Sequence, residues 1–236
     1  MNADFVHYHL ESGVAVITLD DGKVNALGTK LLAELDAALT RAEGEARAVV
    51  LAGRPGRFSA GFDLSVIMGG LDAARDLFRT GGQVMMRLYG CPLPTVAAVT
   101  GHALAGGALL VLCCDSRLAA AGAYKIGLNE VAIGLPLPLF AQRLAADRID
   151  RRAFVAATLQ ATIYNPASAA EVGYVDRVLE VDRDALVTAA TARARELTEL
   201  SAHAYAYTKR RLRERVTEEI LATLDSDLDA ISGLGG

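Results

Sequence analysis

The chain has 236 residues, of which 52% are hydrophobic and 22% are charged, so it is long enough to bury a sizeable core as one domain. Its formal net charge of -4 provides no overall attraction for nucleic acid or for an anionic membrane surface, and we expect neither partner. Charged residues interrupt every apolar stretch of bilayer length, so no membrane-spanning helix is predicted.

The beginning of the chain and its cysteines favour a reducing compartment. Residues 1–5 lack the basic region and the apolar stretch of a secretory signal. The three cysteines show no C-x-x-C spacing, which predicts neither a disulfide framework nor a metal site. A cytoplasmic location is therefore expected.

The first predicted elements are a β-hairpin and a helix. Residues 5–10 and 14–19 flank a short turn that contains Gly13, which is typical of two antiparallel strands. Apolar residues then recur at helical spacing over residues 31–39. His7 and His9 alternate along the first strand with no acidic or cysteine cluster at ligand spacing, so we expect them at the surface and not at a metal.

Strands and helices then alternate, which predicts crossover connections and a parallel sheet. Residues 48–52 and 95–99 are expected to be buried strands, and residues 71–89 an amphipathic helix that Gly81 and Gly82 weaken and could divide. The following predictions are a helix at 108–114, a strand at 115–120, a loop or short strand at 124–130, helices at 139–146, at 151–159 and from 165, a last strand at 175–179, and almost continuous helix from 184.

Two glycine-rich segments follow predicted strands, at residues 53–64 and 100–108. Glycine lets the backbone approach a ligand closely, and the free amides at a helix start attract negative charge. Two such junctions could supply converging amides to an anion. Tight packing between a strand and a helix also explains the glycines of either segment taken alone.

Together these segments resemble the crotonase superfamily, which contains the enoyl-CoA hydratases and isomerases, along nearly the whole chain. The resemblance rests on residues 58–64 and 101–107, on Cys114-Asp115, on Asn25-Ala26-Leu27 and on residues 126–130. It implies an α/β fold with a crotonase-like ββα spiral core over residues 1–184 and a helical C-terminal trimerisation region over residues 185–236. It also implies an acyl-CoA thioester as substrate, no separate cofactor because coenzyme A is part of that substrate, and a homotrimer or hexamer.

The resemblance also implies roles for particular residues. The backbone amides of Phe62 and Gly106 are expected to bind the thioester oxygen, and Glu130 to act as the catalytic acid and base. The residues expected to contact the substrate are Lys23, Ala26, Leu27, Arg57, Ala60, Asp63, Leu109 and Leu135. Among these, Lys23 and Arg57, together with a basic cluster at 209–215, could meet the phosphates of coenzyme A, whereas Asp63 is expected to cap a helix.

One departure from the family pattern bears on the reaction. Hydratases of the family carry a glutamate just after the second glycine segment, and Leu109 occupies that place here. Leucine can neither accept a proton nor hold a water, so the two-acid hydration mechanism lacks a partner. Residues 126–131 with Leu135-Pro136 resemble the Δ3,Δ2-enoyl-CoA isomerases. The expected reaction therefore shifts the double bond of a 3-enoyl-CoA to give a 2-enoyl-CoA in fatty-acid oxidation.

Other functions stay open at this stage, among them a single-acid enoyl-CoA hydratase and a non-catalytic acyl-CoA-binding protein. A serine hydrolase is disfavoured, because residues 57–61 carry arginine where a nucleophile elbow has its first glycine. A nucleotide phosphohydrolase is disfavoured because no Gly-Lys-Ser/Thr follows the glycine segment. His102 and Asp115 are not expected to be catalytic, and Asp115 is assigned a structural role.

The tail from residue 201 carries a stripe of apolar residues at four-residue intervals. The stripe consists of Leu212, Val216, Ile220 and Leu224. On a helix these side chains share one face and need a partner surface. We expect that surface to come from assembly of the chain into a ring.

Overall fold

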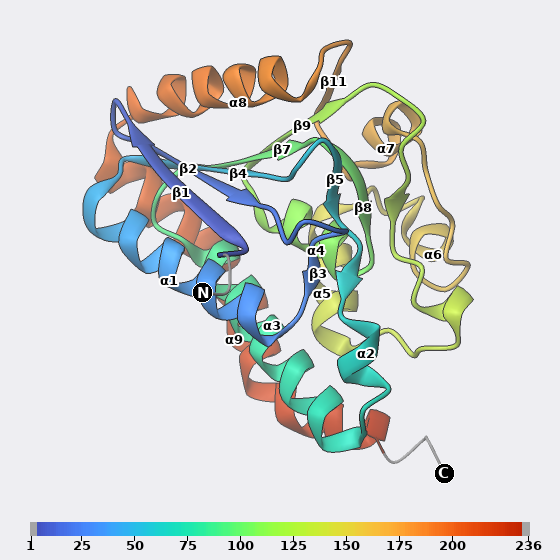
Figure 1. Ribbon diagram of the computed structural model, residues 1–236. Coiled ribbons are helices and arrows are strands. Elements are labelled where there is room, and N and C mark those ends of the chain that lie inside the picture. The colour runs from blue at the N-terminus through green and yellow to red at the C-terminus, as the bar shows by residue number, and fades with distance from the viewer. Residues whose placement is uncertain (1–3, 233–236) are drawn as a thin grey trace.

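The computed structural model describes residues 4–232, and a mixed β-sheet runs through its centre (Figure 1). Its strands follow one another in the order β1 (Val6–Glu11), β2 (Val14–Leu19), β4 (Ala48–Ala52), β7 (Thr95–Val99), β9 (Ser116–Ala120) and β11 (Arg177–Leu179). β1 pairs with β2 antiparallel, as the predicted hairpin requires, and the other neighbours are parallel. The predicted parallel crossovers are therefore confirmed.

A second sheet turns this pattern into a spiral. After β4, β7 and β9 the chain enters β5 (Gly56–Ser59), β8 (Gly101–Leu104) and β10 (Ile126–Gly127), which form a parallel sheet in the order β10-β8-β5. Each pair of strands is followed by helical structure, so the chain repeats a ββα turn as the fold prediction expects.

The strands β5 and β8 lie within the two glycine-rich segments, where the sequence predicts no strand. They are short and carry glycine, so no alternating apolar pattern marks them. Their glycines permit close backbone contact, because a Cβ atom on Gly101 would lie only 1.9 Å from the carbonyl carbon of Gly56. The pairing of these strands is thus a tertiary contact that local sequence does not encode.

The central sheet is buried on both faces, which explains why its parallel strands read as uninterrupted apolar runs. On one face Val50 and its neighbours pack against Leu186 and Ala190 of α8 (Arg183–Thr198). The opposite face forms the main core with α1 (Thr29–Glu45), α3 (Leu71–Gly90) and α4 (Gly106–Cys113). Figure 1 shows α8 on one side of the sheet and α1 and α3 on the other.

The helix α3 is continuous over the predicted residues, so its two glycines do not divide it. A Cβ atom on Gly81 would lie 2.2 Å from a ring carbon of Phe62, and one on Gly82 would lie 3.1 Å from a methyl carbon of Leu224. These glycines therefore make room for neighbouring side chains. The cost of glycine within a helix is offset by burial of the aromatic and aliphatic groups that they admit.

The long helix α9 (Ala202–Ser232) packs against α3 and α5 (Leu139–Arg148) of the same chain. Val216, Ile220 and Leu224 of the predicted stripe are buried there, whereas Leu212 is 74% exposed. The stripe thus finds most of its partner surface within the chain itself, and it does not by itself require another subunit. The expected boundary between residues 184 and 185 falls in the first turn of α8, which begins at Arg183, and the division into two units stays a prediction.

The remaining elements are short. They are β3 (Ala26–Leu27) paired with β6 (Gly61–Phe62), α2 (Leu64–Ile67), the 3-10 helix η1 (Val131–Ile133), α6 (Phe154–Ala157) and α7 (Pro166–Val172). Asn165 caps α7 by accepting a hydrogen bond from the Ser168 amide, as its sequence predicts. The helix predicted at 151–159 is confined to α6. Within residues 4–232, no helix combines the length and the apolar character needed to cross a membrane.

Candidate active site

A small apolar cavity of about 120 Å³ lies between α2, α3, the start of α4 and the segment before α5. The residues that line it are Ala60, Phe62, Leu64, Ile67, Phe78, Ala105, Leu109, Asn129, Glu130, Ile133, Leu135, Pro136, Pro138, Phe140 and Ala141. Within this lining Glu130 is the one ionisable side chain and Asn129 the one amide. A single acid therefore faces an almost wholly hydrocarbon surface.

Glu130 is held in the cavity by the turn that contains it. It directly precedes η1, and its carbonyl oxygen accepts hydrogen bonds from the amides of Ile133 at 3.1 Å and Leu135 at 2.9 Å. Gly134 ends the 3-10 turn at a φ of +80°, a conformation that favours glycine. These contacts leave the Glu130 residue only 8% exposed.

Burial determines the chemistry of Glu130. Loss of water around the carboxylate raises its pKa to about 7, against the smaller lowering effect of nearby backbone amides. Its Oε2 atom is buried and has no hydrogen-bond partner among the described residues. A carboxyl group with such a pKa can both accept and return a proton near neutral pH.

Two strand-to-helix junctions meet beside the cavity. The first leads from β6 to α2, and the second leads from β8 to α4. The Asp63 amide donates to the Leu27 carbonyl at 3.3 Å, and amides alternate in direction along a strand, so the Phe62 amide points away from β3. Gly106 is the first residue of α4, where amides have no acceptor within the helix. A Cβ atom on Gly106 would lie 3.0 Å from the Phe62 ring, which places the two junctions in direct contact.

The first junction is tied down by buried hydrogen bonds from Asn25 and Ser59. The Asn25 amide group donates to the carbonyls of Leu19 at 2.8 Å and Phe58 at 3.0 Å. The Ser59 hydroxyl donates to the Asn25 carbonyl at 2.7 Å and accepts from the Gly61 amide at 3.2 Å. These bonds explain the Asn25-Ala26-Leu27 motif, because they join the residue before β3 to the end of β2 and to β5. They also occupy the Ser59 hydroxyl, which argues against a serine nucleophile.

The second junction contains a strained residue that sequence analysis did not identify. Ala105 has a φ of +49°, which a residue with a Cβ atom rarely adopts. Its amide donates to the Gly127 carbonyl at 2.9 Å, and its carbonyl accepts from the Leu109 amide at 3.1 Å. Strain of this kind persists where surrounding contacts hold it, and it is common at functional sites. The alanine side chain gives no local signal of this conformation.

The structure brings most of the predicted site residues together. Ala60, Phe62, Leu109, Glu130 and Leu135 line the cavity, while Gly106, Leu27 and Ala26 lie in the junctions beside it. Asp63 caps α2 by accepting from the Ser65 amide at 2.9 Å, as expected. Phe78 and Phe140 were missed as site residues, because an apolar residue in a predicted helix carries no sign of what it faces. Both rings pack edge-on against Phe62, with centroids 5.0 and 6.5 Å away.

The predicted phosphate contacts lie outside the cavity. Lys23 is exposed, and Arg57 is half-buried on β5 with its guanidinium donating to the Gly56 carbonyl at 2.8 Å. Arg57 pairs in register with His102, whose Nδ1 accepts from the Lys125 amide at 3.0 Å. Burial lowers the pKa of His102, and the charges of Arg57 and Lys125 lower it further. Arg57 and Lys125 thus place two positive charges close to His102, and Lys125, which directly precedes β10, comes near it because β10 pairs with β8.

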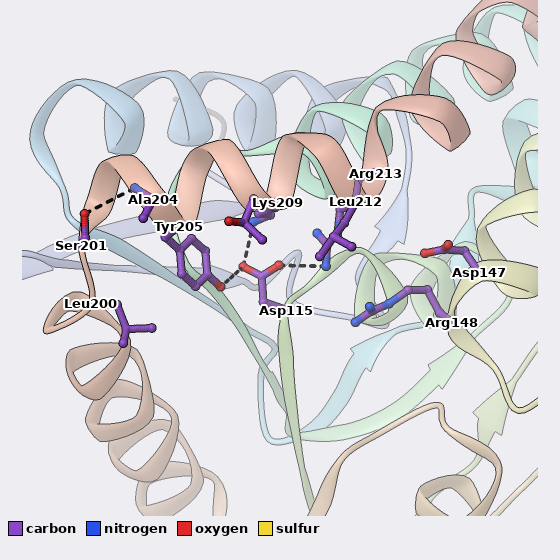
Figure 2. Close-up of a pocket in the computed structure, with 11 residues that line it drawn as sticks. Asp115, Asp147, Arg148, Leu200, Ser201, Ala204, Tyr205, Lys209, Leu212 and Arg213 are labelled. Carbon is purple, nitrogen blue, oxygen red and sulfur yellow. Dashed lines mark hydrogen bonds and ion pairs between the residues drawn. The ribbon is translucent and has the colours of Figure 1, made fainter.

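Two members of the basic cluster at 209–215 serve another purpose. Lys209 and Arg213 reach the Asp115 carboxylate at 2.7 and 2.8 Å, and the Tyr205 hydroxyl donates to it at 2.8 Å (Figure 2). Although burial alone would raise the pKa of Asp115, the two cationic groups hold it below its usual range. Lys209 and Arg213 therefore anchor α9 to the core and are not phosphate contacts. The structural role expected of Asp115 agrees with this geometry.

Comparisons with known proteins agree on one family. A family model for enoyl-CoA hydratase/isomerase matches residues 9–233. Mitochondrial enoyl-CoA delta isomerase 1 of Mus musculus is 32% identical over 222 residues, which cover 92% of this chain and 76% of that protein. A probable enoyl-CoA hydratase of Rhodobacter capsulatus is 37% identical over 176 residues, which cover 66% of this chain and 68% of that protein.

Solved structures match the whole fold. The human mitochondrial Δ3-Δ2-enoyl-CoA isomerase superposes with a TM-score of 0.92 at 30% identity, covering 98% of this chain and 91% of that one. An enoyl-CoA isomerase of Mycobacterium tuberculosis gives a TM-score of 0.88 at 38% identity, covering 98% of both chains. The spiral of ββα turns is therefore the crotonase fold. The chain belongs to the enoyl-CoA hydratase/isomerase family.

Proposed function

We propose that this member of the family is an enoyl-CoA isomerase that converts 3-enoyl-CoA thioesters to 2-enoyl-CoA thioesters in fatty-acid oxidation. The observation that carries the proposal is that Glu130 is the one carboxyl group among the residues lining the cavity, with Leu109 in the place of a second acid. Moving a proton between two carbons needs one group that first accepts and then donates. Its raised pKa suits Glu130 to both tasks.

In the proposed reaction the Glu130 carboxylate removes a proton from C2 of the 3-enoyl-CoA. The electron pair of that C–H bond moves toward the thioester carbonyl and forms a dienolate, whose charge is shared between the thioester oxygen and C4. Glu130, now a carboxylic acid, returns the proton to C4, and the double bond then lies between C2 and C3. No oxidant, reductant or water is consumed.

The backbone amides of Phe62 and Gly106 are proposed to donate hydrogen bonds to the thioester oxygen. Two observations support this role for the amides. The two junctions are in contact, and the Gly106 amide, at the start of α4, has no acceptor within the helix. Donors that already point to where charge develops stabilise the enolate more than the neutral thioester, and each is worth about 3 kcal/mol. The apolar lining strengthens this effect by excluding water.

Coenzyme A is proposed to lie with its phosphates near Lys23 and Arg57. The charged side chains of Arg57 and Lys125 support this orientation, because they lie outside the hydrocarbon cavity and offer local positive charge on an acidic protein. A cytoplasmic setting is kept as part of the proposal, and the buried, unpaired state of Cys91, Cys113 and Cys114 supports it.

Hydration is the second candidate function, since a relative of the family is a probable enoyl-CoA hydratase. It would require Glu130 alone to orient and deprotonate water while a second proton reaches C2. A non-catalytic acyl-CoA-binding protein is a third, which the presence of Glu130 in the cavity disfavours.

A substrate panel separates these functions. Purified protein is incubated with 3-enoyl-CoA and 2-enoyl-CoA thioesters, and double-bond migration and hydration are followed separately. We expect rapid migration and weak hydration. Efficient hydration of 2-enoyl-CoA without any turnover of 3-enoyl-CoA would contradict the isomerase, and binding of both without proton exchange at C2 would favour the binding protein. Leu109→Glu serves as a further arm, with hydration expected to rise if the site admits water.

A further inference from the structure

The Glu130 Oε2 atom is one of three buried polar atoms around the segment 126–130 that have no hydrogen-bond partner within residues 4–232. The other two are Asn129 Oδ1 and the Tyr174 hydroxyl. Nearly all buried polar groups of folded proteins have a partner, because an unpaired one is costly. While Glu130 is charged, the Asn129 and Glu130 oxygens can only accept, and the Tyr174 hydroxyl has a hydrogen to donate.

Tyr174 packs behind the segment that ends in Glu130. It is fully buried and lies two residues after α7, a helix that contacts β10. Its ring packs against the Tyr164 ring, with centroids 5.7 Å apart. Tyr164 exchanges two backbone hydrogen bonds of 2.9 Å with Ile126, the first residue of β10. Tyr174 is therefore held against the strand that leads into the catalytic turn.

The electrostatics of Tyr174 place its hydroxyl near the Glu130 carboxylate. Burial raises the pKa of Tyr174, so the side chain is a neutral phenol near pH 7. The nearby Leu128 amide lowers this pKa, whereas the charges of Tyr164 and Glu130 raise it further. The hydroxyl thus lies close to two positions of the same turn. Tyr174 is not among the residues that line the cavity, so it approaches Glu130 from the protein side.

Few other polar groups face Glu130. On the cavity side its lining offers the Asn129 carboxamide and no second ionisable side chain. The backbone amides of Asn129 and of Glu130 itself favour the carboxylate, but neither forms a hydrogen bond to Oε2. Oε2 therefore needs a donor, and the Tyr174 hydroxyl needs an acceptor. A hydroxyl that donates to a carboxylate forms a charge-assisted bond, which is stronger than one between neutral groups.

We propose that Tyr174 is a positioning residue whose hydroxyl donates a hydrogen bond to Glu130 Oε2, directly or through one water, from behind the cavity. The bond holds the carboxylate in one orientation and leaves Oε1 to take the proton from C2 and return it to C4. It also stabilises the charged form of Glu130, which is the form that starts the reaction. The inference rests on the proposed function for the reaction, but the bond can be tested without substrate.

The pH dependence of isomerisation tests the bond in Tyr174→Phe, which removes the hydroxyl and keeps the ring. Without this donor the carboxylate is less favoured, so we expect the apparent pKa in kcat/KM to rise by about one pH unit. At pH values below that pKa, kcat/KM should fall about tenfold, and the loss should shrink as the pH rises above it. Tyr164→Phe is the matched control, because the ring that packs against Tyr174 loses the same group. We expect its apparent pKa to stay within about 0.3 pH unit of that of the unmodified protein.

Urea unfolding provides a second measurement that needs no substrate. The bond stabilises the folded protein only while Glu130 is charged, so its contribution is present above the folded pKa of Glu130 and lost as pH falls below it. We therefore expect the unfolding constant of Tyr174→Phe to exceed that of the unmodified protein about tenfold at about pH 9, and to equal it at about pH 5. Tyr164→Phe should show no such dependence on pH.

Several outcomes would overturn the proposal. These are an unchanged apparent pKa in Tyr174→Phe, an equal change in Tyr164→Phe, or a loss of kcat/KM that is the same at every pH. A loss of stability that does not depend on pH would assign the hydroxyl to a neutral acceptor such as Asn129 Oδ1. If Tyr174→Phe does not fold, replacing all tyrosines by 3-fluorotyrosine keeps every hydroxyl and makes it a stronger donor. The apparent pKa should then fall, and an unchanged value would contradict the bond.

The two proposals can fail separately. Unfolding involves no thioester, so its dependence on pH does not require isomerase activity. A pH-dependent loss of stability in Tyr174→Phe without turnover of any 3-enoyl-CoA would contradict the isomerase and retain the bond. Isomerisation whose pH profile is the same in Tyr174→Phe and in the unmodified protein would retain the isomerase and remove Tyr174 from the site.

Discussion

The Glu130 side chain is buried, and its Oε2 atom has no hydrogen-bond partner within residues 4–232. Both properties follow from its place in an apolar turn. Replacement by glutamine preserves size but removes the ability to accept a proton. We therefore expect Glu130→Gln to lower the rate of isomerisation by about 10²-fold or more, the scale of positioned acid-base catalysis. The measurement is kcat with a 3-enoyl-CoA, and circular dichroism checks the fold. A fully active variant would remove Glu130 from the mechanism.

The raised pKa of Glu130 also predicts the pH dependence of the enzyme. The starting base is the carboxylate, so kcat/KM should fall about tenfold per pH unit below an apparent pKa of about 7. The same shift affects stability with a defined sign. A carboxyl group whose folded pKa is raised binds its proton more tightly in the folded state, so stability falls as pH rises from its unfolded value through 7. Urea unfolding of Glu130→Gln should show a stability advantage that grows over that interval.

Gly106 tests the second junction. A Cβ atom there would lie 3.0 Å from both Leu27 and the Phe62 ring, so a β-branched residue must displace one of them and its own amide. We expect Gly106→Val to reduce turnover by about 10²-fold or more, the effect of losing an oxyanion donor, with the fold retained. Gly44→Val is the control, because nothing lies within 4 Å of a Cβ atom at Gly44. Equal turnover in the two variants would show that the site is misplaced.

Among the elements, α9 depends on a buried ion cluster for its attachment. The Asp115 carboxylate forms ion pairs with both Lys209 and Arg213, which are 6% and 7% exposed (Figure 2). Asp115→Asn leaves both cations buried without a counter-charge. Because removing one partner of a buried ion pair costs about 3 to 5 kcal/mol, we expect a loss of that size in the free energy of unfolding.

Urea denaturation at neutral pH measures this loss, and Asp225→Asn is the control. Asp225 also joins α9 to the core, through Arg79, but its carboxylate is exposed to solvent, so its removal should matter far less. The pKa of Asp115 is lowered in the folded state, so its contribution should be complete near neutral pH and lost as pH falls through that lowered value. A loss no larger than that of the control would contradict the anchoring role.

At the scale of the whole molecule, the apolar stripe of α9 no longer supports the predicted ring assembly. The apolar stripe of α9 is buried against α3 and α5, and only Leu212 remains outside. Other exposed apolar residues near the start of α9 are Leu200 and Tyr207, which are 54% and 53% exposed. These residues and the family resemblance support the trimer or hexamer, which stays a prediction.

Light scattering over a micromolar concentration series tests the assembly. We expect the mass of a trimer or of two trimers, and we expect Leu212→Asp to shift the distribution to smaller species, because it places a charge on the exposed apolar surface. A monomer throughout the series would show that α9 serves only its own chain.

The sequence by itself determined the order of most elements, the family and the identity of the single catalytic candidate. Hydrophobic periodicity identified α1 and the buried strands β4 and β7, because a residue's tendency to face a core is encoded locally. The motif containing Glu130 and the substitution at Leu109 were visible for the same reason: each depends only on which residues follow one another.

Only the tertiary structure decided how those elements meet. It made strands of β5 and β8, because their pairing depends on glycines from distant segments approaching each other. It kept α3 continuous, because Phe62 and Leu224 fill the space beside its glycines. It also covered the α9 stripe within the chain and brought Phe62, Phe78 and Glu130 to one cavity. Close packing is a non-local property, so the shape of the site follows from contacts between residues that no local pattern relates.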